Sequence, residues 1–145
     1  MPLVTPAGFA PVEPLAFAAA DALPQEGGAA IDLANDADPR PLTVLFDRIA
    51  LIRIAFPSSG DGRGFSLARR LRQLGYRGRL RAHGHVISDQ FRYALDCGFD
   101  EVEIDDNLAA RQPEAHWRLA DRPQRTYRDK LSRRPEAGAA DGAAA

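Results

Sequence analysis

The stretch from Ile49 to Leu71 constrains the fold more than any other part of the sequence. An apolar run ends at Phe56-Pro57, and a loop of Ser, Gly, Asp and Arg residues follows it. Beyond the loop, apolar residues recur at helical spacing: Leu67, Ala68, Leu71 and Leu74. A buried strand, a polar loop and an amphipathic helix in this order predict one βα unit. In parallel α/β folds, the loops that leave the C-terminal ends of strands are the usual ligand-binding positions.

The same alternation of strand and helix continues on both sides of this unit. Strands are predicted over 30–34, 50–56, 79–82 and 101–104, and helices over 39–48, 65–74, 89–97 and 105–119. Two helices end in the same way, in Gly75-Tyr76 and Gly98-Phe99, which indicates a loose βα repeat. We therefore expect a small single α/β domain with a parallel sheet. Four units are too few to close a barrel, so the sheet is open or resembles a half-barrel.

Composition indicates where this domain begins and ends, which partners it favours and where in the cell it is expected. Residues 1–29 are rich in Ala and Pro and are expected to be flexible, residues 30–119 form the domain, and residues 120–145 form a basic and then Ala/Gly-rich tail. The net charge of −1 favours neither nucleic acid nor a membrane surface as a partner. The single cysteine, Cys97, excludes an intramolecular disulfide, and no apolar run is long enough to span a membrane. We expect a cytoplasmic protein.

The loop after the 50–56 strand is the first candidate site. Its glycines would let backbone N–H groups approach a ligand, and the next helix would direct its positive dipole end to the same place. An oxyanion such as phosphate, sulfate, sulfite or carboxylate would suit these groups. Alternatively, the loop is a structural turn in which Asp61 pairs with Arg63 or caps the helix. The candidate residues are Ser58, Asp61, Gly62, Arg63, Gly64 and Ser66.

The next predicted exit loop, 83–88, adds a second group of candidates. Arg81, His83 and Arg63 would converge if neighbouring strands end at one edge of the sheet. Ser88 is predicted to cap the following helix, and Asp89 and Gln90 would face the same edge. We expect His83 and His85 to be ordinary loop histidines, with proton transfer as the alternative. No third and fourth metal ligand is evident, so no metal site is predicted. The acidic residues near the last strand are expected to form a solvated face: Glu101, Glu103, Asp105 and Asp106.

Several separated motifs in this order resemble one bacterial protein family. They are Leu33-Ala34-Asn35-Asp36, Phe56-Pro57, Asp61 to Ser66 with Ala68, Leu71-Arg72, Gly78, Leu80-Arg81-Ala82, Gly84, Asp89-Gln90 and Cys97-Gly98-Phe99-Asp100. Together they are similar to the DUF934 family over residues 31–118. Members commonly carry an acidic residue where this chain has His85, which argues further against a His-x-His metal site.

The resemblance implies a role in sulfur metabolism, because members are described as probable oxidoreductases or accessory proteins of sulfite reduction. The expected partner is the sulfite reductase haemoprotein, with a small oxyanion as a second ligand; the family supplies no catalytic residue. The sequence contains neither a GxGxxG motif nor a Cys pair, so no redox cofactor can be named and enzymatic activity stays undecided. Three functions remain open: an accessory protein of sulfite reduction, a small barrel-like enzyme for phosphorylated or carboxylated metabolites, and a non-catalytic interaction domain.

Overall fold

The computed structural model describes residues 2–18, 23 and 27–118. The strands are β1 (Pro2–Thr5), β2 (Gly8–Pro11), β3 (Phe17–Ala18), β4 (Ala29–Leu33), β5 (Ile49–Phe56), β6 (Arg79–Gly84) and β7 (Glu101–Glu103). The α-helices are α1 (Arg63–Gln73), α2 (Phe91–Cys97) and α3 (Asp106–Arg111), and the 3-10 helices are η2 (Arg40–Arg48), η3 (Ser88–Gln90) and η4 (Glu114–Trp117). None of the helices described could cross a membrane, since each is too short or too polar.

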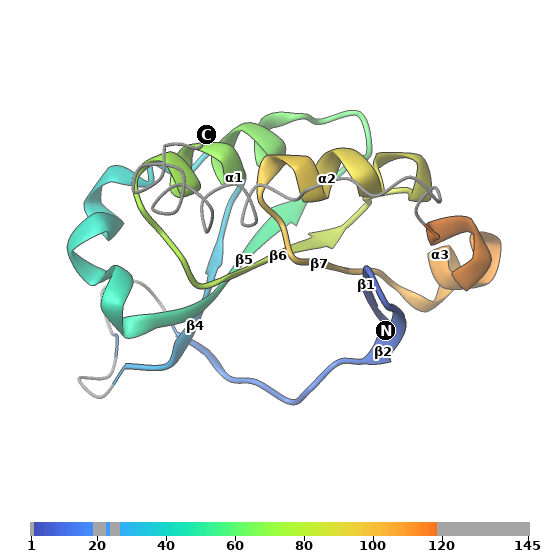
Figure 1. Ribbon diagram of the computed structural model, residues 1–145, viewed down its shortest axis with the longest axis horizontal. Helices are drawn as coiled ribbons and strands as arrows, with labels where there is room; N and C mark the ends of the chain where they lie inside the picture. Colours follow the sequence, from blue (N-terminus) through green and yellow to red (C-terminus); the bar gives the residue numbers. More distant parts are fainter. Residues whose placement is uncertain (1, 19–22, 24–26, 119–145) are drawn as a thin grey trace, which may run out of the picture.

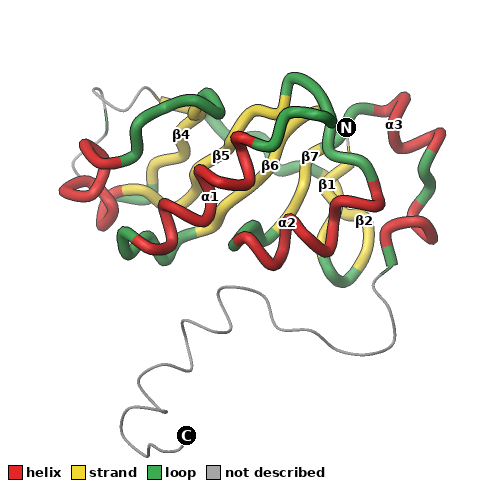
Figure 2. The backbone as a smooth tube through the Cα atoms, turned by 90° about the horizontal axis from the view of Figure 1, so that it is seen from above, coloured by secondary structure: helices red, strands yellow, loops and turns green. Residues whose placement is uncertain are grey.

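A seven-stranded open sheet in the order β2-β1-β7-β6-β5-β4-β3 forms the centre of the molecule. From β3 to β7 the neighbouring strands are parallel, and each crossover moves one strand along the sheet. Right-handed crossovers that all move in one direction place their helices on the same face. Figures 1 and 2 show α1 and α2 side by side on that face. The predicted α/β class and the open sheet are therefore confirmed. The sheet is mixed and not purely parallel as predicted, because β1 pairs antiparallel with both β2 and β7.

Alternation along the strands separates an apolar face from a charged face. In β5, Ile52, Ile54 and Phe56 are buried under the helices, where Phe56 packs against Phe65 and Phe99 with ring centroids 4.9 and 5.7 Å apart. The intervening positions of β4 to β7 point to the other face, and most of them are charged residues or histidine: Asp32, Arg53, Arg79, Arg81, His83, Glu101 and Glu103. We call this second surface the charged face. None of the α-helices in the described part of the chain lies on this face (Figure 1).

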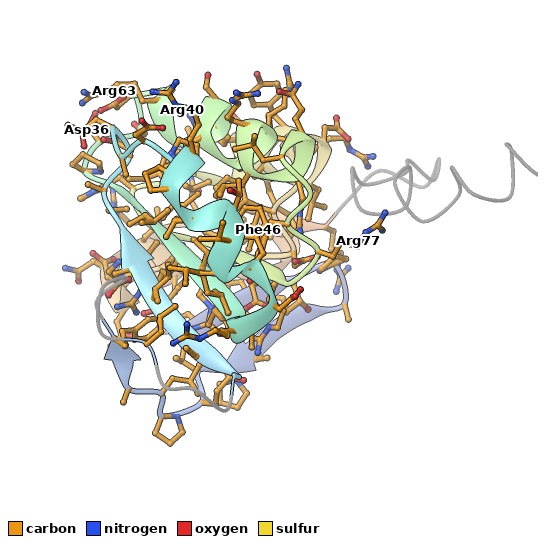
Figure 3. The ribbon with its side chains drawn as sticks, turned by 90° about the vertical axis from the view of Figure 1, so that its left-hand side faces the viewer. Asp36, Arg40, Phe46, Arg63 and Arg77 are labelled. Carbon is orange, nitrogen blue, oxygen red and sulfur yellow. The ribbon has the colours of Figure 1, made fainter. Side chains whose placement is uncertain are left out.

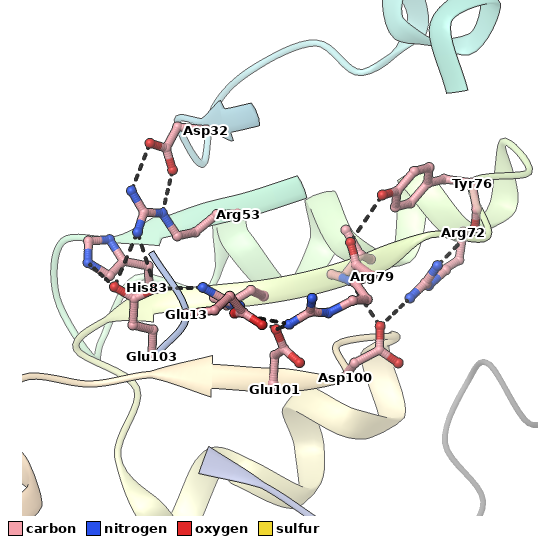
Figure 4. Close-up of polar contacts among 12 residues, drawn as sticks. Glu13, Asp32, Arg53, Arg72, Tyr76, Arg79, His83, Asp100, Glu101 and Glu103 are labelled. Carbon is pink, nitrogen blue, oxygen red and sulfur yellow. Dashed lines mark hydrogen bonds and ion pairs between the residues drawn. The ribbon is translucent and has the colours of Figure 1, made fainter. Parts of the chain in front are cut away.

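A buried arginine in α1 forms hydrogen bonds with the turn that follows this helix and with the segment before β7. Arg72 is 1% exposed and donates to the carbonyls of Tyr76, Gly78 and Gly98 at 2.7–3.1 Å and to Asp100 at 3.1 Å. Figure 4 shows this group beside the charged face. A buried charge is tolerated when its donors are satisfied in this way. Two of the family-like motifs, Leu71-Arg72 and Gly98 with Asp100, therefore have a structural role.

The N-terminal prediction was wrong where the structure describes the chain. Residues 2–18 were expected to be flexible, but they contribute β1, β2 and β3 to the sheet. The β1–β2 hairpin pairs antiparallel with β7, and Leu3 and Val4 are buried. Short alternating segments can gain enough burial by joining an existing sheet, which their composition did not reveal. The expectations for the tail, 120–145, lie outside the described residues.

Three local expectations also need correction. The strand β6 continues through His83 to Gly84, so His83 does not belong to an exit loop. The N-cap of η3 is Ile87, and Ser88 instead donates its N–H to Gln112 at 2.7 Å. The last helix does begin at an Asp105 cap, 2.7 Å from the Leu108 N–H, but it ends at Arg111 and is followed by η4.

Candidate functional site

The loops after β4, β5 and β6 lie together at one edge of the sheet. Asn35 donates to Asp61 at 2.9 Å, which joins the first loop to the second. Gln90 donates to the Ser59 carbonyl at 2.7 Å, which joins the third loop to the second. The structure thus brings together the strand-end loops that the sequence placed side by side, including Gln90. Asp89 is exposed next to it, and Ser58 lies on the exposed part of the middle loop.

A bidentate ion pair holds Arg63 within its own loop. Its Nε and Nη2 donate to Asp61 at 3.0 and 2.8 Å, and its backbone N–H donates to the same carboxylate at 3.1 Å. These bonds hold the pKa of Asp61 well below its usual value, so this carboxylate is charged at neutral pH. The structure therefore contains the ion pair between Asp61 and Arg63 that the sequence offered as the alternative to an anion site. An external anion would have to displace Asp61 before it could bind Arg63 with both nitrogens.

The glycines of the loop do not use conformations reserved for glycine. Gly60, Gly62 and Gly64 are absent from the positive-φ residues, and Gly62 has φ −85° as the N-cap of α1. Gly64 is required for another reason, since a Cβ there would collide with the Phe56 ring. The glycine at 64 therefore lets α1 approach β5 closely. A Cβ added at Gly60 or Gly62 would meet no atom within 4 Å, and both residues are exposed.

Arg63 and Asp36 line one depression of about 320 Å³ beside α1, together with Ser66 and Arg70. Figure 3 shows Asp36, Arg40 and Arg63 at the same end of the molecule. Arg40 is paired there with Asp38 at 2.9 Å, and its hydrogen bonds lower the pKa of Asp38 to about 2. Acidic and basic side chains alternate at this end of the molecule. This end of the molecule therefore does not offer an anion a purely positive surface.

Arg81 and His83 do not join Arg63, because both lie on the charged face. Arg81 is completely buried and pairs with Glu101 at 2.8 Å and with Glu103 at 3.1 Å. His83 Nε2 lies 3.6 Å from Glu103. No described hydrogen bond or ion pair links either residue to Arg63. The expected convergence fails because strand alternation directs positions 81 and 83 away from the helices.

The charged face is a continuous ion-pair network that the sequence did not reveal. Arg53 pairs with Asp32 at 2.6 Å and Glu103 at 3.2 Å, and its guanidinium carbon lies 3.8 Å from the centre of the Phe17 ring. Glu101 and Glu103 are only 6% and 4% exposed, so the expected solvated acidic face is wrong for these two. The signal was available as charges at every second position of β6 and β7 (Figure 4).

A groove between α1 and α2 is the second surface that sequence reasoning missed. It measures about 310 Å³ and is lined by Phe65, Ser66, Arg69, Arg70, Gln73 and Tyr93. Tyr93 is 49% exposed, and its ring meets that of Phe65 at 5.0 Å. Among the described residues, no carboxylate lies within ion-pair distance of Arg69 or Arg70. We call this surface the α1–α2 groove, and of the predicted candidates it includes Ser66 alone.

Cys97 lies under this groove and is completely buried. Arg69 donates to its sulfur at 3.3 Å, and burial raises the pKa of the thiol above its usual value. The thiol is therefore neutral and unreactive at neutral pH. In the described part of the chain, no three His, Cys, Asp or Glu side chains are grouped so that they would hold a metal ion.

One family matches the sequence and covers most of the chain. It is described as "Bacterial protein of unknown function (DUF934)", and it matches residues 30–136. No curated protein and no solved structure gives a significant match.

Proposed function

The chain belongs to the DUF934 family, and we propose that it is a non-catalytic accessory protein of assimilatory sulfite reduction. In this proposal it binds an acidic surface of the sulfite reductase haemoprotein through the α1–α2 groove. The family resemblance supplies the pathway and the partner. The groove supplies the surface, and its lack of any lining carboxylate is the observation that carries the docking role.

The composition of the groove favours a protein partner. Arginine and tyrosine are enriched at the energetic centres of protein interfaces because they combine apolar area with hydrogen-bonding groups. Arg69, Arg70 and Tyr93 provide this combination on one exposed surface. Helix α1 contains no acidic residue, so its positive charge is not neutralised from within the helix. A partner surface rich in Asp and Glu would be attracted to this groove.

The enzyme alternative has less support from the geometry. It requires Arg63 to bind the anion of a substrate and His83, His85 or Asp89 to transfer a proton to it. Arg63 is held by Asp61 at the start of α1, whereas His83 lies on the charged face of the sheet. A single small substrate would not reach Arg63 and His83 together, because the sheet separates α1 from the charged face. The alternative therefore depends on His85 or Asp89, which are exposed in the segment after β6, and on displacement of Asp61 from Arg63.

The direct test is binding of the purified chain to the haemoprotein of the same bacterium. Replacing Arg69 and Arg70 together by Glu reverses the charge of the groove, and we expect at least about a tenfold loss of affinity. Arg77→Glu is the matched control, because Arg77 is an exposed arginine just beyond α1 and outside the groove (Figure 3). We expect it to change the affinity less than about twofold.

The controls separate the groove from general electrostatics. Equal losses in the groove variant and in Arg77→Glu would refute the assignment to the groove. Absence of any complex at low ionic strength would refute the partner. In cells, a deletion strain should grow poorly with sulfate as sole sulfur source and normally with cysteine, and normal growth on sulfate would overturn the proposed pathway.

A further inference from the structure

One carboxylate of the charged face comes from outside the parallel strands. Residues 12–16, which we call the strap, cross the charged face between β2 and β3 (Figure 1). The strap carries Glu13, whose Oε1 accepts hydrogen bonds from Arg81 Nη2 at 2.6 Å and from Arg79 Nη2 at 3.5 Å. Glu13 is therefore bound between two arginines as the carboxylate of a ligand would be (Figure 4).

The sheet builds this pair of arginines independently of the strap. Arg79 and Arg81 stand two residues apart on β6, so both point to the charged face. Arg81 pairs in register with Glu101 of β7, which accepts from Arg81 Nε at 2.8 Å and from Arg79 Nη2 at 2.6 Å. Glu103 accepts a hydrogen bond from Arg81 Nη1. These contacts hold both guanidinium groups in place and leave Nη2 of Arg81 for Glu13.

Glu13 is held at this position less firmly than the carboxylates of β7. Its side chain is 43% exposed, whereas those of Glu101 and Glu103 are 8% and 5% exposed. Strap residues 12–16 belong to no strand or helix, and the side chain of Arg79 is itself 39% exposed. Rotation of the Glu13 side chain into solvent would therefore open a space for one carboxylate without moving the sheet.

We propose that Arg79 and Arg81 form a binding site for the carboxylate of a small organic acid, in which Glu13 is an exchangeable internal ligand. The exchange replaces one carboxylate by another, so the charge of the network does not change. A charge-assisted bond to the buried Arg81 would supply most of the affinity. This site lies on the face of the sheet opposite α1 and α2, and it is independent of the α1–α2 groove.

Chemical rescue tests the site. Glu13→Ala leaves Arg81 Nη2 without this acceptor, and we expect the melting temperature to fall by about 5 °C. Adding 100 mM sodium acetate at neutral pH should recover at least half of that loss by mass action, and sodium chloride at the same concentration should not. The unmodified chain should respond much less to the same acetate concentration, because Glu13 already occupies the acceptor position beside Arg81.

Two control variants make the rescue specific. Glu114→Ala also removes a carboxylate, one that accepts from the Phe9 N–H at 2.9 Å away from any arginine pair, and acetate should not rescue it. Arg79→Met in the Glu13→Ala background should weaken acetate binding at least about threefold, since one of the two cations is lost.

If Glu13→Ala does not fold, Glu13→Gln provides the background for the same titrations. Equal effects of acetate and chloride would overturn the proposal. Rescue that is unchanged by Arg79→Met, or that also appears in Glu114→Ala, would overturn it as well.

Discussion

Replacing Arg72 by Met should be among the most destabilising single changes in the domain. Methionine keeps much of the apolar stem but leaves the carbonyls of Tyr76, Gly78 and Gly98 without their charged donor. Asp100 also loses the hydrogen bond from Arg72, although it still accepts from the Leu80 N–H at 2.9 Å. Breaking a buried, hydrogen-bonded charge pair costs about 3–5 kcal/mol. Because the side chain of Asp100 is 22% exposed and water can replace part of the lost contact, we expect the free energy of unfolding to fall by about 4 kcal/mol.

Urea denaturation followed by tryptophan fluorescence measures this loss. Trp117 is the single tryptophan, is 3% exposed and packs on Phe91 with ring centroids 5.7 Å apart, so its emission reports unfolding. The urea midpoint should fall by about 2–3 M. Arg70→Met, on the exposed side of the same helix, should change stability by less than about 0.5 kcal/mol. A loss below about 1 kcal/mol in Arg72→Met would show that the buried hydrogen bonds do not hold the helix in place.

Two further predictions follow from the packing of α1 and from the ionisation of the strap. Gly64→Ala should lose about 1–3 kcal/mol by overpacking the Phe56 ring, whereas Gly62→Ala, with open space around it, should be nearly neutral; denaturation midpoints in the opposite order would contradict this. Hydrogen bonding to Arg81 holds the pKa of Glu13 below 4.5 in the folded chain, so this contact stabilises fully above pH 4.5 and is lost as the pH falls through the lowered pKa. Hydrogen exchange of residues 12–17, corrected for intrinsic rates, should therefore become faster as the pH falls through this range in the wild type, but not in Glu13→Gln. Identical pH profiles for the two chains would refute this prediction.

Regular periodicity made the central part of the fold predictable. The strand β5 and the helix α1 lie close to their predicted ranges, because a buried strand and an amphipathic helix impose different spacings on apolar residues. The same spacing places Arg72 four residues after Ala68, on the buried side of α1. Its burial depends on carbonyls brought by Gly98 and the turn after α1, which helical spacing alone does not predict.

The N-terminal strands were not predictable in the same way. The hairpin of β1 and β2 gains its stability from pairing with β7, which lies about a hundred residues away in sequence, as the register of Leu3 with Glu103 shows. Local composition contains no trace of such a partner. The same holds for the strap, since the contact between Glu13 and Arg81 depends on the path of the chain across the sheet.

The candidate site shows that the position of an arginine after a strand does not indicate whether its charge is already paired with a carboxylate. Arg63 and Arg81 were chosen because each lies near a strand end, yet Asp61 holds the first and β7 holds the second. Arg69 and Arg70 attracted no attention as members of an ordinary amphipathic helix, although no described carboxylate pairs with either. Whether an arginine is free to bind a partner depends on the carboxylates that the fold places beside it. The charge that is available to a partner must therefore be worked out after the strands are aligned, and this criterion is the reason for proposing the α1–α2 groove, and not the loop at Arg63, as the docking surface.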